Sequence, residues 1–371
     1  MKQLVLKTLN HQQIIEIEHT PLGSGGEGTV HRILKPQMWM KDFCVKLYYP
    51  QFRTSQYEEK IAYMMAHQPQ KIREDNYLIC WPDGLIYEDG IFVGFRMPFA
   101  FTDSETLYEL CIPIIRDSLP MEWRAFDRQT LEGMIARAKL CQRLAVPIHR
   151  IHELQYYVFV DLKPKNILVT PQGKVALIDL DSIQISDKMI IAHNGRVMTP
   201  EYMPPESKTI EPNKECIPLS WDLFSMAVIF YQVLIGLHPF VAACAQRCGD
   251  RERECNEIYE KILCGISPYG ANANYIETVP KLHQYFEKTL PQSIQQLFIK
   301  AFKDGHAHPE LRPTAEEWGI AFNEELRRIP YNFFYQTEIM FATIEPTVPL
   351  ALPPRSFWDR LKAAILRLFF R

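Results

Sequence analysis

Acidic and amide side chains recur at close spacing in residues 158–182, a stretch that is otherwise rich in valine, leucine and isoleucine. Asp161, Asn166 and Asp179 flank a short hairpin pattern whose turn lies at 171–173. Carboxylates among such apolar residues are costly to bury without a partner. Either these side chains lie in solvated turns, or they bind a charged group.

A second group of residues with chemical potential lies near the N-terminus. The segment GSGGEGTV places Gly23, Gly25 and Gly28 at the spacing GxGxxG, followed by Val30. Glycines at this spacing let backbone N–H groups approach phosphate oxygens without an intervening Cβ. A dinucleotide-binding fold would continue with a helix, whereas this sequence continues with a strand, as in a flap that covers a nucleotide. A flexible hairpin without a ligand is the alternative.

Lys46 lies in the apolar strand pattern FCVKLYY (43–49), where its ammonium group needs a partner. For Lys46 alone, the alternative is a side chain that reaches solvent from an edge strand. The helical segment that follows, at about 55–67, carries Glu58 on its apolar face and Glu59 one step aside. We expect Glu58 to form an ion pair with Lys46, and Glu59 is the alternative partner.

The elements that must position these residues divide the chain into two parts. Residues 1–98 have the alternation of strands, which is clearest in a hairpin at 85–99 around Asp89-Gly90. From about residue 100 the pattern is helical, with an amphipathic helix at 128–154 and an apolar, buried helix at 219–237. Two further expected strands are at 14–22 and 29–34.

Composition limits the classes of function. The chain has 371 residues, of which 47% are hydrophobic and 23% charged, as in a globular protein with a large core. Its net charge of −3 gives no reason to expect nucleic-acid binding. The first apolar run is interrupted by Lys7 and is shorter than a secretory signal requires, so we expect none, and no apolar run reaches the length of a membrane span. Nine cysteines without a CxxC pair indicate reduced thiols and a cytoplasmic location.

The order of these segments resembles that of the protein kinase superfamily over residues 14–330. DLKPKN at 161–166 resembles the catalytic loop, DLD at 179–181 the metal-binding turn, and TPEYMPPE at 199–206 the segment that ends in Ala-Pro-Glu. The resemblance implies an α+β, bilobal fold with a small β-rich N-lobe, 1–98, and a larger, mainly helical C-lobe, 99–330. It also implies that Asp222 braces the catalytic loop and that Arg312 pairs with Glu206.

By resemblance, the chain transfers the γ-phosphate of ATP to a serine or threonine of a protein substrate, with Mg²⁺ as the metal. Asp161 would orient the attacking hydroxyl and accept its proton, while Lys163 offsets charge on the transferred group. Lys46, braced by Glu58, would hold the α- and β-phosphates, and Asn166 and Asp179 would bind Mg²⁺. The residues implied around the rest of the nucleotide are Leu22, Gly23, Gly25, Gly28, Val30, Cys44, Met97, Phe99 and Leu168.

The sequence departs from the family pattern at two places. Phe159-Val160 stands where the family has His-Arg, so a phosphate on the activation segment lacks its usual receptor. We therefore expect activity that does not depend on phosphorylation of Ser182, Ser186 or Thr199. The third residue of the metal-binding turn is Asp181 instead of glycine. We expect Asp181 to cap the next turn, and a metal contact is the alternative. The form of both loops resembles a bacterial branch of the superfamily.

The sequence is also compatible with two other functions. An ATP-binding pseudokinase would act as a regulatory binding module, and a small-molecule kinase would phosphorylate a metabolite. The presence of Lys46, Asp161, Asn166 and Asp179 favours catalysis over the first, because pseudokinases usually lack one of these groups. The segment 199–206 favours a protein acceptor over the second, because in the family it builds the floor on which the peptide lies.

Two side features need a separate interpretation. Four cysteines near His238, namely Cys244, Cys248, Cys255 and Cys264, fit no finger spacing, so we expect incidental thiols, with a zinc site as the alternative. After a proline-rich linker, 331–354, the amphipathic segment 355–371 carries five basic residues and one acidic residue. This segment suits peripheral contact with an anionic membrane surface or an acidic partner, and a helix docked on the C-lobe is the alternative.

Overall fold

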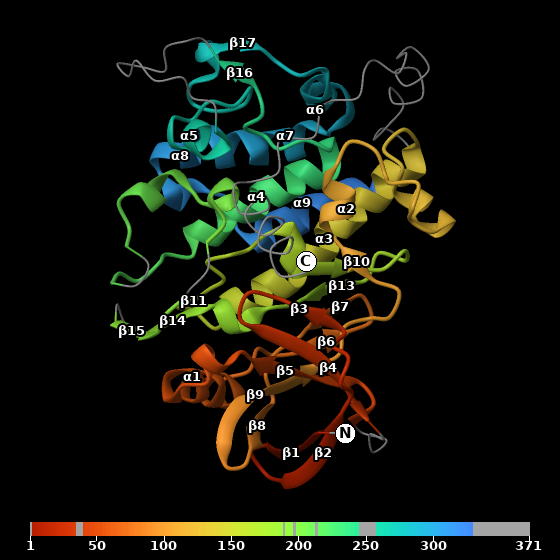
Figure 1. Ribbon diagram of the computed structural model, residues 1–371. Helices are drawn as coiled ribbons and strands as arrows, with labels where there is room; N and C mark the ends of the chain where they lie inside the picture. The colour runs from red at the N-terminus through yellow and green to blue at the C-terminus, as the bar shows by residue number, and fades with distance from the viewer. Residues whose placement is uncertain are drawn as a thin grey trace, which may run out of the picture.

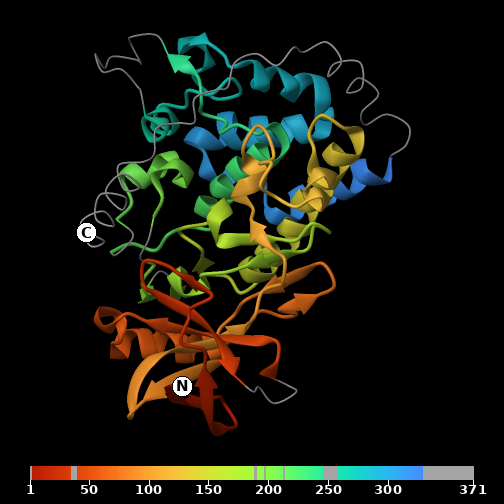
Figure 2. The ribbon, with the colours of Figure 1, turned by 45° about the vertical axis from the view of Figure 1, so that its right-hand side comes forward.

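The computed structural model of the chain describes residues 2–34, 40–187, 190–195, 198–211, 214–244 and 257–328. A part rich in strands, drawn in red and orange, packs against a part made mainly of helices (Figures 1 and 2). No helix within the described ranges is long and apolar enough to cross a membrane. The expected linker 331–354 and segment 355–371 lie outside the described residues, as do Cys248 and Cys255.

The N-terminal part is built on an antiparallel sheet of seven strands in the order β2-β1-β8-β9-β5-β4-β3. A further pairing between β2 and β4 closes the sheet on itself. The expected strands and the 85–99 hairpin are present. The first expected strand, 14–22, ends at residue 17. Strand β1 was not expected from the sequence. The strands are β1 (Lys2–Lys7), β2 (Gln12–Ile17), β3 (Gly23–Ser24), β4 (Gly28–Leu34), β5 (Phe43–Tyr48), β8 (Gly84–Glu88) and β9 (Ile91–Pro98).

Helix α1 (Ser55–Ala66) packs on β8 and β9, as the 55–67 pattern predicts. Its buried face carries the apolar residues Tyr57, Ile61, Met64 and Met65, and it also carries Lys60. A lysine on the buried face of a helix requires a polar partner. The position of α1 therefore determines where the charge of Lys60 lies relative to Lys46.

A second sheet joins the two parts of the chain, in the strand order β10-β12-β13-β7-β6. The β12–β13 hairpin, which the sequence predicts, pairs on its far side with β7 in parallel register, so that Leu78 lies opposite Ala176. Residues 76–80, from the expected N-lobe, are thus hydrogen-bonded to a hairpin of the helical part. The strands are β6 (Arg73–Glu74), β7 (Tyr77–Ile79), β10 (Glu105–Thr106), β12 (Ile167–Val169) and β13 (Val175–Leu177).

The helical part surrounds α4 (Ser220–Ile235), in which every residue after Ser220 is buried. The long α3 (Leu131–His152) contains Pro147, as predicted, and packs on α4 and α9 (Ala315–Arg327). The remaining α-helices are α2 (Tyr108–Cys111), α5 (Ile258–Leu263), α6 (Tyr285–Thr289), α7 (Gln292–Ile299) and α8 (Gly305–Ala307). The remaining strands are β11 (Tyr157–Val158), β14 (Gln184–Asp187), β15 (Ile190–His193), β16 (Ala243–Cys244) and β17 (Ile276–Thr278).

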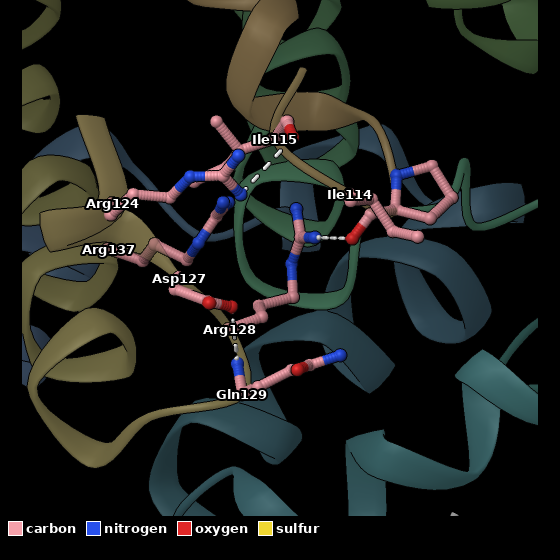
Figure 3. Close-up of a pocket in the computed structure, with 8 residues that line it drawn as sticks. Ile114, Ile115, Arg124, Asp127, Arg128, Gln129 and Arg137 are labelled. Atoms are coloured by element: carbon pink, nitrogen blue, oxygen red, sulfur yellow. Dashed lines mark hydrogen bonds between the residues drawn. The ribbon is translucent and has the colours of Figure 1, made fainter. Parts of the chain in front are cut away.

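Two buried arginines tie α2, α3 and the C-terminal end of α4 together. Arg137 donates to the carbonyl oxygens of Phe126, Leu110 and Val233 at 2.5–2.6 Å. Arg128 donates to the carbonyl oxygens of Leu234 at the end of α4 and of Leu110, Ile112 and Pro113 in and after α2. Both side chains line a small cavity of about 100 Å³ (Figure 3). The guanidinium groups satisfy helix-end carbonyls that would otherwise lack a donor.

The predicted pair between Arg312 and Glu206 is confirmed. The two guanidinium nitrogens Nη1 and Nη2 of Arg312 lie 2.6 and 2.7 Å from the two carboxylate oxygens of Glu206. The Arg312 side chain is fully buried and also donates to the carbonyls of Gly305 and Ser220. The pair fixes the end of the 199–206 segment to the core of the helical part.

Replacing Arg312 with methionine is expected to destabilise the fold strongly, because it leaves the Glu206 carboxylate without its partner. The expected loss is about 3–5 kcal/mol of unfolding free energy, measured by urea denaturation. The control is Arg328→Met, which removes an exposed guanidinium from its pair with Glu325 and is expected to cost at most about 1 kcal/mol. Equal losses in the two variants would contradict the role assigned to the buried pair.

Candidate active site

Backbone bonds to Asp222, in the first turn of α4, hold the loop before Asp161 in place. The Asp222 carboxylate accepts from the backbone N–H groups of Phe159 at 2.9 Å and Val160 at 3.3 Å, and His152 Nε2 lies 3.1 Å away. The predicted brace is therefore confirmed. It stabilises a strained residue, because Val160 has a φ of 64°, which is rare for a β-branched side chain.

Asp161 is 4% exposed and lies at the centre of a three-residue network. Its carboxylate accepts from Lys163 Nζ at 2.5 Å and from the Thr199 hydroxyl at 2.7 Å. Lys163 also donates to Thr199 Oγ1 at 3.0 Å. Burial raises the pKa of Asp161, while the charge and hydrogen bond of Lys163 oppose that rise. The network fixes the direction of a carboxylate that has little access to water.

The structure brings Asn166 and Asp179 close to Asp161. Asn166 donates its side-chain N–H to the Asp161 carbonyl at 3.0 Å, and its own carbonyl accepts from the Ile178 N–H at 3.0 Å. Asp179, the residue after Ile178, has a left-handed backbone conformation with a φ of 61°, and its side chain is 45% exposed. Since the amide nitrogen of Asn166 is engaged, its side-chain oxygen and the Asp179 carboxylate are the atoms available to a cation. Such oxygen donors suit Mg²⁺.

Lys46, on β5, lies between two aspartates of the 179–181 turn. Its Nζ donates to Asp179 Oδ1 at 2.7 Å and to both carboxylate oxygens of Asp181 at 2.7 and 2.8 Å. Burial alone would lower the pKa of Lys46, but the two carboxylates, with Asp181 first, raise it above its ordinary value. Lys46 is therefore a buried cation with two anionic partners.

The predicted ion pair between Lys46 and Glu58 is wrong. Glu58 instead accepts from the Tyr87 hydroxyl at 2.5 Å, and within the described ranges neither Glu58 nor Glu59 bonds to Lys46. The physical reason is that Asp181 already satisfies Lys46. The expectation that Asp181 caps the next turn is wrong for the same reason. The sequence signal for this arrangement was the acid that replaces glycine at position 181.

The glycine-rich segment forms the expected hairpin, in which Gly23 on β3 pairs with Val30 on β4. The Gly25 N–H donates to the Gly28 carbonyl at 2.9 Å, which closes the turn. A Cβ at Gly28 would lie 2.1 Å from the Leu47 carbonyl oxygen, whereas Cβ atoms at Gly23 or Gly25 would meet no atom within 4 Å. Close packing against Leu47 therefore requires glycine at position 28, whereas positions 23 and 25 have open space beside them.

The predicted adenine residues come from several strands and the segments beside them, with Val30 on β4. Leu22, which is 43% exposed, leads into β3, and Leu168 is half-buried on β12. Cys44 on β5 is buried opposite Met97 on β9. The Phe99 N–H donates to the Asp42 carbonyl at 2.6 Å. That N–H is therefore engaged within the protein.

The predicted zinc alternative has no support from His238. Both ring nitrogens of His238 are engaged, one with the Glu201 carbonyl at 2.8 Å and the other with the Phe240 N–H at 3.2 Å. Burial lowers the pKa of His238 to about 3, so the ring is neutral. Cys264 is a free thiol, and the described part of the chain holds no group of three His, Cys, Asp or Glu side chains arranged for a metal.

Comparisons with known proteins agree with this geometry. The family model of the protein kinase domain matches residues 100–319, which is more than half of the chain. Human citron Rho-interacting kinase is 36% identical over 156 residues, and human serine/threonine-protein kinase MRCK alpha is 30% identical over 146 residues. Serine/threonine-protein kinase Genghis Khan from Drosophila melanogaster is 30% identical over 162 residues.

These three matches cover 39–43% of this chain and only 8–10% of the relatives' own length. These matches therefore span only a small part of much longer proteins. The residues matched by the family model, 100–319, include Asp161, Asn166 and Asp179. The chain belongs to the protein kinase domain family.

Proposed function

We propose that the chain is a serine/threonine protein kinase that transfers the γ-phosphate of ATP to a hydroxyl of a protein substrate. The observation that carries this proposal is the network of Asp161, Lys163 and Thr199 beside Asn166 and Asp179. It places a fixed carboxylate, a cation and oxygen donors for a metal within one small region. Phosphoryl transfer depends mainly on such positioning and charge neutralisation.

In the proposed reaction, the acceptor oxygen forms a bond to the γ-phosphorus while the bond to the β–γ bridging oxygen breaks and ADP leaves. Asp161 orients the acceptor hydroxyl and takes its proton. Lys163 stabilises negative charge on the transferred group. Lys46 and the backbone of the 23–28 hairpin bind the phosphates. Asn166 and Asp179 would hold Mg²⁺, which would supply positive charge against the triphosphate.

The remaining nucleotide contacts follow from the elements described above. Leu22, Val30, Cys44 and Leu168 supply apolar side chains that suit the two faces of a purine. Met97 lies at the back, and the backbone near Phe99 forms the edge of the site. Since the Phe99 N–H is engaged by Asp42, the base takes its hydrogen bonds from other backbone groups of this segment.

A protein acceptor is supported by the anchored 199–206 segment. Thr199 is bonded to Asp161 at one end, and Glu206 is bonded to Arg312 at the other. A segment fixed at both ends beside the carboxylate offers a rigid floor for an extended peptide. The names of the relatives also include serine/threonine-protein kinases, which agrees with this class of acceptor.

The test is a transfer assay with γ-labelled ATP, Mg²⁺ and a generic protein acceptor. Label on serine or threonine, lost when Mg²⁺ is chelated, is the expected result. Binding of Mg-ATP without transfer would instead favour a regulatory pseudokinase, and label only on small metabolites would favour a small-molecule kinase. Label on tyrosine alone would contradict the proposed acceptor class.

Activity is expected without phosphorylation of Ser182 or Ser186. Both side chains are buried and donate to carbonyl oxygens, of Asp179 and Tyr156 respectively. Between them, Gln184 bonds to the backbone of Glu215 and Ile217, so this segment is ordered without a phosphate. The double variant Ser182→Ala, Ser186→Ala should transfer phosphate within about threefold of the native rate.

Thr199 needs a separate variant because its hydroxyl is part of the Asp161 network. Thr199→Ser keeps the hydroxyl and should retain transfer, whereas Thr199→Ala loses the bond to Asp161 and should be slower. Mass spectrometry of the active native protein should find residues 182, 186 and 199 unmodified. Activity that appears only after phosphorylation of one of these residues would refute the prediction.

A further inference from the structure

We propose that Asp181 is the positioning residue that holds Lys46 in place for the nucleotide phosphates, and that no acid of α1 takes part. This proposal rests on the proposed function, because it assigns Lys46 to phosphate binding. It concerns a residue that replaces glycine in the metal-binding turn.

The two aspartates of the turn differ in what they can reach. The Asp181 side chain is 1% exposed and holds Lys46 with both oxygens, while the Asp179 side chain is 45% exposed. The Tyr48 hydroxyl donates to Asp181 at 2.7 Å and fixes its carboxylate. Asp179 is thus the carboxylate available to a cation from solvent. If Asp179 turns to Mg²⁺, Asp181 still holds Lys46.

Helix α1 brings a cation to this region instead of an anion. The buried Lys60 donates to the Asn194 carbonyl at 2.9 Å. Lys46 and Lys60 both have favourable charge interactions with the Asp181 carboxylate. Two lysines from separate elements therefore share the field of one buried carboxylate.

The other acids near Lys46 have different roles. Glu58 accepts from Tyr87, and Glu59 is exposed. Glu27, in the glycine-rich hairpin, accepts from the Tyr57 hydroxyl at 2.9 Å. Burial first, and then the charge of Asp181, raise the pKa of Glu27. The ion pairs of Lys46 within the described ranges are thus both with the 179–181 turn.

The pairing of Lys46 with Asp181 changes which part of the protein sets the orientation of Lys46. In protein kinases generally, the strand lysine pairs with a glutamate of the following helix, and moving that helix switches the pair on and off. Here the partner lies in the same turn as the proposed metal ligand. Displacement of α1 would leave the Lys46–Asp181 pair intact, so the orientation of Lys46 depends on the conformation of the 179–181 turn.

The experiment compares Asp181→Asn with Glu58→Gln, the rival partner, and with Asp187→Asn, an exposed control on the same segment. The readouts are affinity for a magnesium-bound non-hydrolysable ATP analogue, kcat/KM and the unfolding midpoint. Loss of a buried charged hydrogen bond predicts a fall of about 30- to 100-fold in analogue affinity and kcat/KM for Asp181→Asn. The other two variants should stay within about threefold of native.

A second arm tests whether Asp181 acts through Lys46. In a Lys46→Met background, Asp181→Asn should change analogue affinity by less than about twofold, because coupled residues are not additive. Additive losses, or a larger loss for Glu58→Gln than for Asp181→Asn, would overturn the proposal. If Asp181→Asn does not fold, Tyr48→Phe serves instead, with an expected loss of about three- to tenfold that disappears in the Lys46→Met background.

The analogue titration separates this proposal from the proposed function. Absence of phosphoryl transfer in the native chain would defeat the proposed function. The same chain would still show, through analogue affinity, whether Asp181 or Glu58 supports Lys46. Equal analogue affinity in native protein and Asp181→Asn would defeat the assignment of Asp181 even in an active kinase.

Discussion

The Asp161→Asn variant is expected to bind Mg-ATP with near-native affinity and to lose phosphoryl transfer by about 100- to 10,000-fold. Asparagine keeps the shape of the side chain, with one oxygen that can accept from Lys163 and an amide nitrogen that can donate to the Thr199 hydroxyl oxygen. It cannot take the proton of the acceptor hydroxyl. Single-turnover kinetics with γ-labelled ATP, together with a nucleotide titration, would separate the loss of chemistry from a loss of binding.

The control for Asp161 is Asp75→Asn, which changes an exposed aspartate in a turn outside the site and should leave transfer unchanged. Transfer by Asp161→Asn at more than a tenth of the native rate would contradict the assigned role. The native pH profile offers a second check. Since burial raises the pKa of Asp161 and the base must be unprotonated, activity should fall on the acid side, beginning at a higher pH than for an exposed aspartate.

The Asp179→Asn variant is expected to reduce transfer by about 1,000-fold and to require much more Mg²⁺ for nucleotide binding. Its carboxylate is the exposed oxygen donor of the turn, and an amide is a weaker ligand for a hard cation. Lys46 should remain in place through Asp181. The unfolding midpoint should therefore change little, which distinguishes the expected effect from loss of the fold.

The measurement for Asp179 is a Mg²⁺ titration of nucleotide affinity in the native protein and the variant. An unchanged Mg²⁺ dependence would show that other residues hold the ion. Asp187→Asn is the matched control, because it removes a carboxylate farther along the same segment. The two Asp variants, at 161 and 179, should thus fail in different ways, one in proton acceptance and one in metal binding.

Much of the site could be predicted because its residues are close in sequence or lie at the ends of strongly patterned elements. The 158–182 stretch carries Asp161, Asn166 and Asp179 on one loop and one hairpin, so local spacing brings them together. Asp222 lies at the start of an apolar helix whose burial is evident from composition. Such signals depend on few long-range contacts.

The partner of Lys46 could not be predicted in the same way. Helical periodicity places Glu58 and Lys60 about 200° apart around α1, and the sequence does not say which side chain points to β5. The answer depends on how the 179–181 turn, more than 130 residues away, approaches Lys46. Very short strands such as β6 and β7 were missed because two or three residues carry no readable alternation.

The parallel pairing of β7 with β13 has a mechanical consequence. Two backbone bonds, from the Val175 N–H to the Asn76 carbonyl at 3.0 Å and from the Cys80 N–H to the Leu177 carbonyl at 3.0 Å, clamp residues 76–80 to the hairpin before Asp179. A rigid-body rotation of the strand-rich part would therefore leave residues 76–80 with the hairpin. The glycine-rich hairpin takes no part in this clamp and has open space beside Gly23 and Gly25, so under the proposed function it is the part that we expect to move when nucleotide exchanges.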